Sequence, residues 1–309
     1  MIISGALSLV ACNDNNVNQK YTVGVCQLVQ HDSLDQATQG FIDALVAELG
    51  EENVEIDVQN AAGDTNVCNT IITSFVSKNV DLIMANATPA LQAAYNATTT
   101  IPILGTSITE YGVALGTTLT NDVVGGNVSG TSDLANLEDQ AQMILEICHD
   151  VKVVGITYCS AEANSLYQVQ KVTEYLENHG VTVNAYPFAD SNDISAVVTA
   201  ACAQCDALYI PTDNTAASCA EIIGNIVREA KTPVFTGEEN TARVCGVASL
   251  TISYYDLGVT TGKMAAKILK GEANVSQMAV EYAAPTKKYN KTMCELLGLP
   301  VPAGYVEME

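Results

Sequence analysis

Polar side chains gather where apolar runs end in this 309-residue chain, and almost none of them is basic. Segments 28–33 and 211–214 are typical, and the only arginines, Arg228 and Arg243, lie outside such segments. A site for a multivalent anion normally carries an Arg fork or Lys charges. Carboxylates suit an ammonium group instead, and hydroxyls with helix N–H groups suit one carboxylate. The pattern favours a zwitterion such as an amino acid.

The sequence gives little support for catalysis or for a bound cofactor. The three histidines, His31, His149 and His179, are scattered, and no HExxH, GxSxG, P-loop or GxGxxG pattern is present. The CxxC spacing of Cys202 and Cys205 joins the end of a predicted helix to the start of a predicted strand. A redox motif needs its first thiol near a helix N-terminus, which lowers the thiol pKa. We therefore predict no catalytic residue, no metal and no cofactor.

A structural alternative exists for several of the polar residues. Ser160, Thr88 and Asp213 are good helix N-caps, worth about 1 kcal/mol each to their helices. Glu238 and its acidic neighbour Glu239 would also be stable as an exposed, solvated pair. Helix capping and exposure to solvent thus explain part of the excess of polar residues at the ends of the apolar runs, without any ligand.

Composition narrows the class of protein. Thirteen basic and 35 acidic side chains give a net charge of −22, which repels phosphate backbones and excludes nucleic acid as a partner. The hydrophobic fraction of 48% is ample for sizeable cores, and no uninterrupted apolar run is long enough to span a membrane. The length suggests two domains.

The N-terminal segment predicts export. Residues 2–11 form an apolar run that ends at Cys12, and a polar tether follows. Leu9-Val10-Ala11-Cys12 resembles a bacterial lipobox, in which the cysteine is lipidated and becomes the new N-terminus. No Lys or Arg precedes the run, so an ordinary apolar terminus stays open as the alternative. Of ten cysteines, nine remain after Cys12, an odd number that cannot pair completely.

Strand and helix patterns alternate in two similar series. The expected elements are strands at 23–29, 54–58, 81–85 and 101–105 with helices at 34–49, 67–77 and 89–97, then strands at 153–158, 181–186, 207–210 and 233–236 with helices at 165–178, 194–202 and 216–229. A strand at 246–252, a helix at 256–270, a strand at 279–282 and a short amphipathic piece at 291–297 follow. This order predicts right-handed βαβ units with parallel sheets.

The two series share residues as well as periodicity. Segment 80–89 parallels 205–214, and segment 100–107 parallels 231–238. The glycine-rich segment 124–130 suits a crossing between lobes, and further crossings would make a hinge of several strands. We predict an α/β protein with two Rossmann-like lobes. Its expected parts are a signal and tether at 1–20, an N-terminal lobe at 21–128 plus 253–278, and a C-terminal lobe at 129–252 plus 279–309.

Several strings resemble one protein family. They are Tyr21-Thr-Val-Gly-Val-Cys-Gln-Leu-Val-Gln-His-Asp-Ser-Leu-Asp35, Val80-Asp-Leu-Ile-Met-Ala-Asn-Ala-Thr-Pro89, Ser160-Ala-Glu-Ala-Asn-Ser165, Pro211-Thr-Asp-Asn-Thr215, Gly237-Glu-Glu239 and Ser253-Tyr-Tyr-Asp-Leu-Gly258. They are similar to segments of ABC-importer substrate-binding lipoproteins, in the branch associated with tryptophan and other aromatic amino acids. The resemblance implies a type I periplasmic-binding-protein fold, a ligand held between the lobes and no catalysis.

The resemblance also implies binding residues and partners. By position in the matching motifs, the ligand-binding residues would be Leu34, Thr88, Ser107, Ser160, Glu162, Asn164, Asp213 and Glu238. A monomer anchored through a lipid on Cys12 at the outer face of the cell membrane would deliver an amino acid to ABC permease and ATPase subunits. A sensor or effector domain of the same fold, or an importer component for a sugar or nucleoside, is the alternative.

Overall fold

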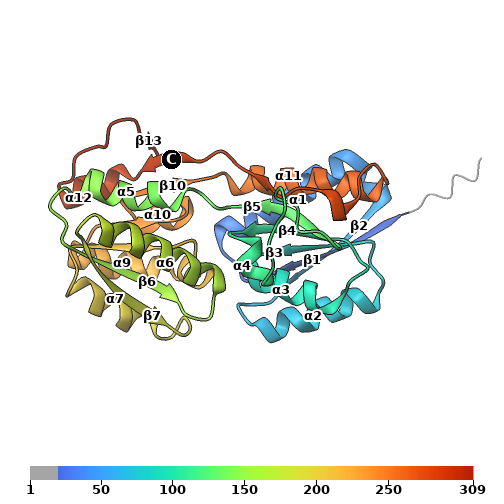
Figure 1. Ribbon diagram of the computed structural model, residues 1–309, viewed down its shortest axis with the longest axis horizontal. Coiled ribbons are helices and arrows are strands. Elements are labelled where there is room, and N and C mark those ends of the chain that lie inside the picture. The colour runs from blue at the N-terminus through green and yellow to red at the C-terminus, as the bar shows by residue number, and fades with distance from the viewer. Residues whose placement is uncertain (1–19, 309) are drawn as a thin grey trace, which may run out of the picture.

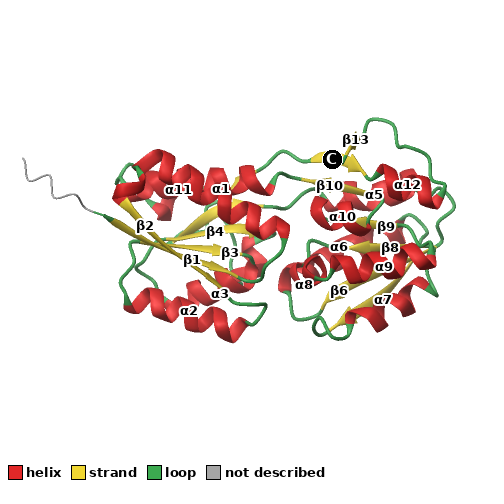
Figure 2. Cartoon of the chain, turned by 180° about the vertical axis from the view of Figure 1, so that it is seen from behind, coloured by secondary structure: helices red, strands yellow, loops and turns green. Residues whose placement is uncertain are grey.

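Two α/β lobes lie side by side and are joined along one edge (Figure 1). The computed structural model describes residues 20–308. The predicted fold is confirmed, since each lobe is built around a sheet of mainly parallel strands. Figure 2 shows each sheet (yellow) enclosed by helices (red). Cys12 and the predicted signal segment lie outside the described residues.

The N-terminal lobe has a six-stranded sheet in the order β11-β5-β4-β3-β1-β2. Its strands, all paired in parallel, are β1 (Tyr21–Gln27), β2 (Val54–Asn60), β3 (Leu82–Asn86), β4 (Ile103–Ile108), β5 (Val128–Ser132) and β11 (Glu281–Tyr282). Its helices are α1 (Asp32–Leu49), α2 (Thr65–Ser77), α3 (Thr88–Ala97), α4 (Tyr111–Leu115) and α11 (Tyr254–Leu269), with the 3₁₀ turns η1 (Glu51–Asn53) and η2 (Val275–Gln277).

Alternating side chains of the central strands supply the cores on the two faces of this sheet. On β3, Leu82 and Met84 join the cluster with α1 and α11, whereas Ile83 and Ala85 join the cluster with α2 and α3. Helices α1 and α11 approach closely because both carry glycine at the contact. A Cβ on Gly258 would lie 2.0 Å from the Ala37 carbonyl oxygen. The last helix of this lobe is thereby held against the first.

The C-terminal lobe has a seven-stranded sheet in the order β13-β12-β10-β9-β8-β6-β7. Its strands are β6 (Val153–Cys159), β7 (Thr182–Phe188), β8 (Ala207–Ile210), β9 (Val234–Thr236), β10 (Ala248–Thr251), β12 (Thr286–Tyr289) and β13 (Val306–Glu307). Its helices are α5 (Leu137–Ile147), α6 (Ala163–Asn178), α7 (Ile194–Cys202), α8 (Asn214–Ser218), α9 (Ala220–Ala230), α10 (Glu239–Cys245) and α12 (Lys291–Leu297). Only the β10–β12 pair is antiparallel among the described pairs.

The repeat seen in the sequence is a repeat of topology. The order β5-β4-β3-β1-β2 in one lobe corresponds to β10-β9-β8-β6-β7 in the other. The matching segments 80–89 and 205–214 contain β3 and β8, and segments 100–107 and 231–238 contain most of β4 and all of β9. Equivalent sequence strings therefore occupy equivalent strands, and their polar ends occupy equivalent loops.

The chain passes between the lobes three times, at 133–136, 252–253 and 283–285. Strand β5 pairs with β4 and β11 pairs with β5, so both belong to the N-terminal lobe. The first and third crossings thus lie a few residues after the positions 128 and 278 expected from the sequence. Three separate connections allow the lobes to rotate about a common edge without either one unfolding.

The prediction that segment 124–130 crosses between the lobes is wrong. Gly125 and Gly126 form a turn with φ of +85° and +61°, and the chain then enters β5 within the same lobe. Gly130 is required there because a Cβ would lie 2.0 Å from the Gly105 carbonyl oxygen. The glycines serve a turn and a close approach of two strands.

Several helices differ from expectation. The predicted helix 216–229 is two helices, α8 and α9, that meet at Cys219. Helices α4, α5 and α10 were not predicted. No described helix has the length and apolar character needed to cross a membrane. Within residues 20–308 no group of His, Cys, Asp and Glu has the arrangement of a metal site.

Candidate functional site

The carboxyl ends of the central parallel strands in the two sheets face one another across a cleft. A cavity of about 430 Å³ lies there and is lined from both lobes, with Leu28, Val29 and Pro89 on one side and Cys159 and Thr215 on the other. Parallel sheets bind ligands at this edge because loops and helix N-termini converge on it. The prediction of a cavity shared by both lobes is confirmed.

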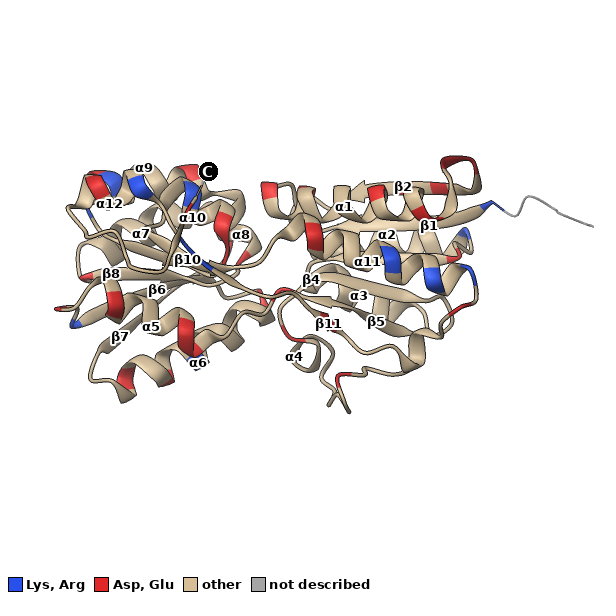
Figure 3. Cartoon of the chain, turned by 90° about the horizontal axis from the view of Figure 1, so that it is seen from above, with Lys and Arg blue, Asp and Glu red and all other residues tan. Residues whose placement is uncertain are grey.

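A smaller cavity of about 240 Å³ lies further along the same interface. Its walls include His31 from the N-terminal lobe and Ser218, Glu238 and Asn240 from the C-terminal lobe. His31 occupies the N-cap position of α1 without a capping hydrogen bond, and its Nε2 has no partner among the described residues. Figure 3 shows acidic residues (red) in the region where the lobes approach each other.

Glu162 is buried and fully engaged within its own lobe. Its Oε1 accepts hydrogen bonds from the backbone N (2.9 Å) and hydroxyl (2.8 Å) of Thr215, and its Oε2 accepts from the side chain of Asn214 at 2.7 Å. The carboxylate thus holds the start of α8 against the loop before α6.

Asp213 has a comparable structural role. Its Oδ1 accepts from Ala216 N at 2.8 Å, and its Oδ2 accepts from Cys159 N at 2.6 Å and from the Ser165 hydroxyl at 2.7 Å. Burial, with the charge of Glu162 as a second cause, raises its pKa to about 7. Asp213 joins β6, α6 and α8, so its removal would disturb the lobe as well as the cleft.

Glu238 connects the two lobes. Its Oε2 accepts a hydrogen bond from the Ser33 hydroxyl of α1 at 2.5 Å, and its carboxylate also caps α10 through the N–H groups of Asn240 and Thr241. The Asn240 side chain donates to Ser33 Oγ at 2.9 Å. Glu238 is 3% exposed, so it is not a solvated surface acid. Its neighbour Glu239 pairs instead with Lys288 and Arg243.

Three predicted residues carry polar groups at the strand ends, inside the protein. Thr88 is not a helix N-cap, because it is the first residue of α3; the N-cap is Ala87 (φ 89°), which offers no side-chain acceptor to the helix. Ser107 Oγ and Asn164 Oδ1 are buried and have no hydrogen-bond partner among residues 20–308. Ser107 has a φ of 57°, a left-handed conformation that a non-glycine residue adopts rarely and often at functional sites.

The remaining two predicted residues lie differently. Leu34 is fully buried in α1 and belongs to the core cluster with α2 and α3. Ser160 is exposed, and its hydroxyl donates to the Phe188 carbonyl oxygen at 3.1 Å. Ser160 is not a helix N-cap, because α6 begins at Ala163 with Glu162 in that position. Ligand contact by any of the eight residues stays a prediction.

Asp133 was missed by the sequence analysis, although it follows a strand end like the others. It comes directly after β5 and is 4% exposed. Its Oδ2 accepts from the Tyr254 hydroxyl at 2.9 Å, but its Oδ1 has no partner among the described residues. Burial, with the charge of Glu238 as a further cause, raises its pKa to about 6. Prediction of β5 as a strand would have drawn attention to it.

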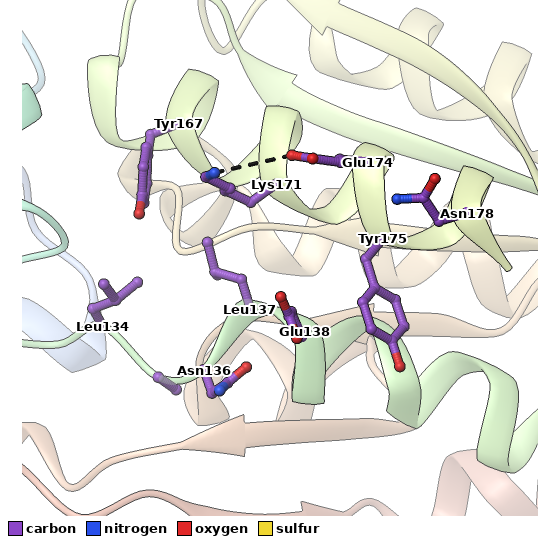
Figure 4. Close-up of a pocket in the computed structure, with 10 residues that line it drawn as sticks. Leu134, Asn136, Leu137, Glu138, Tyr167, Lys171, Glu174, Tyr175 and Asn178 are labelled. Carbon is purple, nitrogen blue, oxygen red and sulfur yellow. Dashed lines mark ion pairs between the residues drawn. The ribbon is translucent and has the colours of Figure 1, made fainter.

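A further cavity of about 430 Å³ lies on the C-terminal lobe, between α5 and α6 (Figure 4). Lys171 and Glu174 of α6 form an ion pair of 3.9 Å along its rim, and Leu134 and Leu137 lie opposite. Its lining comes from α5, α6 and the first crossing, without any strand end of the N-terminal lobe. This cavity is not part of the interlobe cleft.

These features define a two-lobed ligand-binding protein, and comparison with known proteins assigns its family. The family model of ABC transporter substrate binding proteins matches residues 22–302. The chain is 34% identical over 290 residues to the tyrosine-binding protein of Clostridioides difficile, covering 88% of this chain and 84% of the relative. The chain therefore belongs to the ABC transporter substrate-binding protein family, a substrate-binding type of protein.

Solved structures agree with this assignment. An ABC domain from Streptococcus pneumonia in complex with L-Trp is 32% identical, with a TM-score of 0.89 over 93% of this chain and 99% of that one. The ligand-free, open structure of a Clostridium difficile substrate binding protein with adhesive properties is 35% identical, with a TM-score of 0.70 over 94% of this chain and 99% of that one.

Substitution of Ser33 tests the contact between the lobes. S33A removes the hydroxyl that donates to Glu238, and a hydrogen bond to a charged group contributes about 1.5–3 kcal/mol. We expect the ligand-free variant to populate open lobes more, with a larger radius of gyration in X-ray scattering and about tenfold weaker ligand binding. S77A, an exposed hydroxyl on α2, is the matched control. Unchanged scattering and affinity in S33A would remove this contact from the closure mechanism.

The buried acids predict how stability depends on pH. The pKa of Asp133 is raised in the folded state, so the native protein holds this proton more firmly than the unfolded chain. The stabilisation of the folded state by this proton is fully present below about pH 4 and is lost as pH rises through about 6. D133N should therefore raise the Tm of the ligand-free protein at pH 8 by roughly 2–6 °C and flatten the decline between pH 5.5 and 8.

Thermal unfolding across that pH range checks the expectation, with D139N as the control because Asp139 is an exposed acid of the nearby helix α5. Parallel pH profiles for the wild type and D133N would contradict it.

Proposed function

We propose that this chain captures an aromatic amino acid in the cleft between its lobes and delivers it to the membrane subunits of an ABC importer. The observation that carries the proposal is the shared cavity, whose apolar walls lie beside polar, cation-free strand ends. Its volume falls in the range of small-molecule sites. The tyrosine-binding relative and the L-Trp complex support the aromatic class of ligand.

The strand ends provide groups of both polarities for a zwitterion. The N-terminus of α3 directs N–H groups and the Thr88 hydroxyl towards the edge of the sheet, where they suit a carboxylate. Ser107 follows on the neighbouring strand β4 with an unpartnered hydroxyl. Asn164 contributes an unpartnered amide oxygen from the opposite lobe. Apolar residues such as Leu28, Val29 and Pro89 then surround the side chain of the ligand.

Closure of the lobes gives the mechanism. A ligand that touches both lobes has higher affinity for the closed form and shifts the population towards it. This structure has a higher TM-score with the L-Trp complex than with the ligand-free, open protein, at similar identity and coverage. Rotation of one lobe against the other lowers such a score, which supports a closed arrangement here.

The cellular setting of the proposal follows from family and sequence together. The protein works outside the cytoplasm, and Cys12 carries the lipid that holds it at the outer face of the membrane. Each lobe of the closed form presents one docking surface, and the ATPase subunits drive release of the ligand.

Thermal shift of the purified chain tests the proposed ligand class. L-tyrosine, L-tryptophan or L-phenylalanine at 100 times its Kd should stabilise the fold by about 2.7 kcal/mol, which corresponds to roughly 5–10 °C in Tm. L-leucine, D-glucose and adenosine serve as comparison ligands, and calorimetry then measures the Kd. A shift with the sugar or the nucleoside, and none with any amino acid, would overturn the proposal.

A further inference from the structure

We propose that Asp133, together with Ser107, binds the α-ammonium group of the amino acid and thereby selects amino acids over their des-amino acids. The inference rests on the proposed function, because it concerns the same edge of the sheet; Asp133 and Ser107 lie at the ends of β5 and β4, on the hinge side of the cavity lined by Leu28 and Pro89. It adds a residue that decides which chemical class of aromatic ligand is held.

Geometry places the two residues next to each other. Asp133 directly follows β5, and Ser107 lies in the neighbouring strand β4. These two strands are paired, with Ser132 of β5 opposite Ile108 of β4. Asp133 N donates to the Ile108 carbonyl oxygen at 3.2 Å, so the two strand ends are joined at this level. A shift of register between Gly105 and Ile108 and the left-handed backbone of Ser107 interrupt the regular alternation of side chains in β4. Two neighbouring strand ends therefore each present one buried polar atom that lacks a partner.

Charge explains why a cation belongs there. A buried carboxylate is costly unless it is paired, and no Lys or Arg of the described residues forms an ion pair with Asp133. The groups around it are Tyr254, which donates one hydrogen bond, the hydroxyl of Thr109, Tyr111 and the second acid Glu238. Tyrosine hydroxyls do not neutralise a carboxylate, and Glu238 adds negative charge. An ammonium group supplies the missing positive charge and can donate to both Asp133 Oδ1 and Ser107 Oγ.

The position of Asp133 also connects recognition to closure. It lies in the first crossing between the lobes, and its partner Tyr254 begins α11 directly after the second crossing. A cation bound to Asp133 Oδ1 would therefore contact a side chain whose hydrogen bond to Tyr254 already joins the first and second crossings between the lobes.

The test compares paired ligands on paired variants. L-tyrosine and 3-(4-hydroxyphenyl)propionate differ only by the ammonium group, as do L-tryptophan and indole-3-propionate. D133N keeps the shape of the side chain and an acceptor for Tyr254 but removes the charge. Calorimetry, with competition up to millimolar concentrations, measures the four ligands on the wild type, D133N and the exposed control D139N. Because loss of one partner of a buried charge pair is expensive, D133N should weaken amino-acid binding at least about 30-fold. The des-amino acids should bind D133N as tightly as the wild type, or more tightly.

Each other outcome is decisive. If D133N loses affinity for both members of a pair equally, Asp133 is a structural residue of the hinge and the assignment is wrong. If D133N binds the amino acids within about threefold of the wild type, the ammonium lies elsewhere and the assignment is again wrong, while the proposed function stands. If the wild type binds no aromatic amino acid, the proposed function falls and this assignment falls with it.

Discussion

Burial of negative charge between two lobes is the constraint on which the rest of this structure depends. Asp133, Glu162, Asp213 and Glu238 are each at most 4% exposed, and none forms an ion pair with a Lys or Arg of the described residues. Three of them are compensated by several backbone and side-chain donors. Asp133 accepts a hydrogen bond from the Tyr254 hydroxyl, and its Oδ1 has no partner among residues 20–308. We infer that a positively charged group of the ligand completes this arrangement.

Duplication of one topology produces the cleft in which that charge is buried. Because the two sheets have equivalent strand orders, the loops after β3, β4 and β5 are matched by those after β8, β9 and β10. The lobes bring these two sets of loops together, and three crossings keep them in register. Close contact of α1 with α11, enforced by glycine, fixes one crossing to the body of the N-terminal lobe. Ser33 and Glu238 then stabilise the approach of the lobes directly.

Hydrophobic periodicity was sufficient to predict both lobes and most of their central strands, since buried parallel strands are continuous apolar runs. It failed for β5, whose sequence Val-Ser-Gly-Thr-Ser has one large apolar residue. This strand is held by hydroxyl contacts such as Thr131 with Thr106 and Thr261, and by the absence of a side chain at Gly130. Asp133 was overlooked as a consequence. Glu162 and Asp213 were found, but spacing alone does not distinguish an acid that caps a neighbouring helix from one that contacts a ligand.

A crystal structure of the complex with L-tyrosine or L-tryptophan tests the central claim most directly. The account predicts one ligand molecule between the lobes, with its α-nitrogen within hydrogen-bond distance, about 2.7–3.2 Å, of Asp133 Oδ1. Its ring would extend along the cleft towards Pro89. A ligand bound only in the separate cavity between α5 and α6, with the interlobe cleft filled by solvent, would contradict the account.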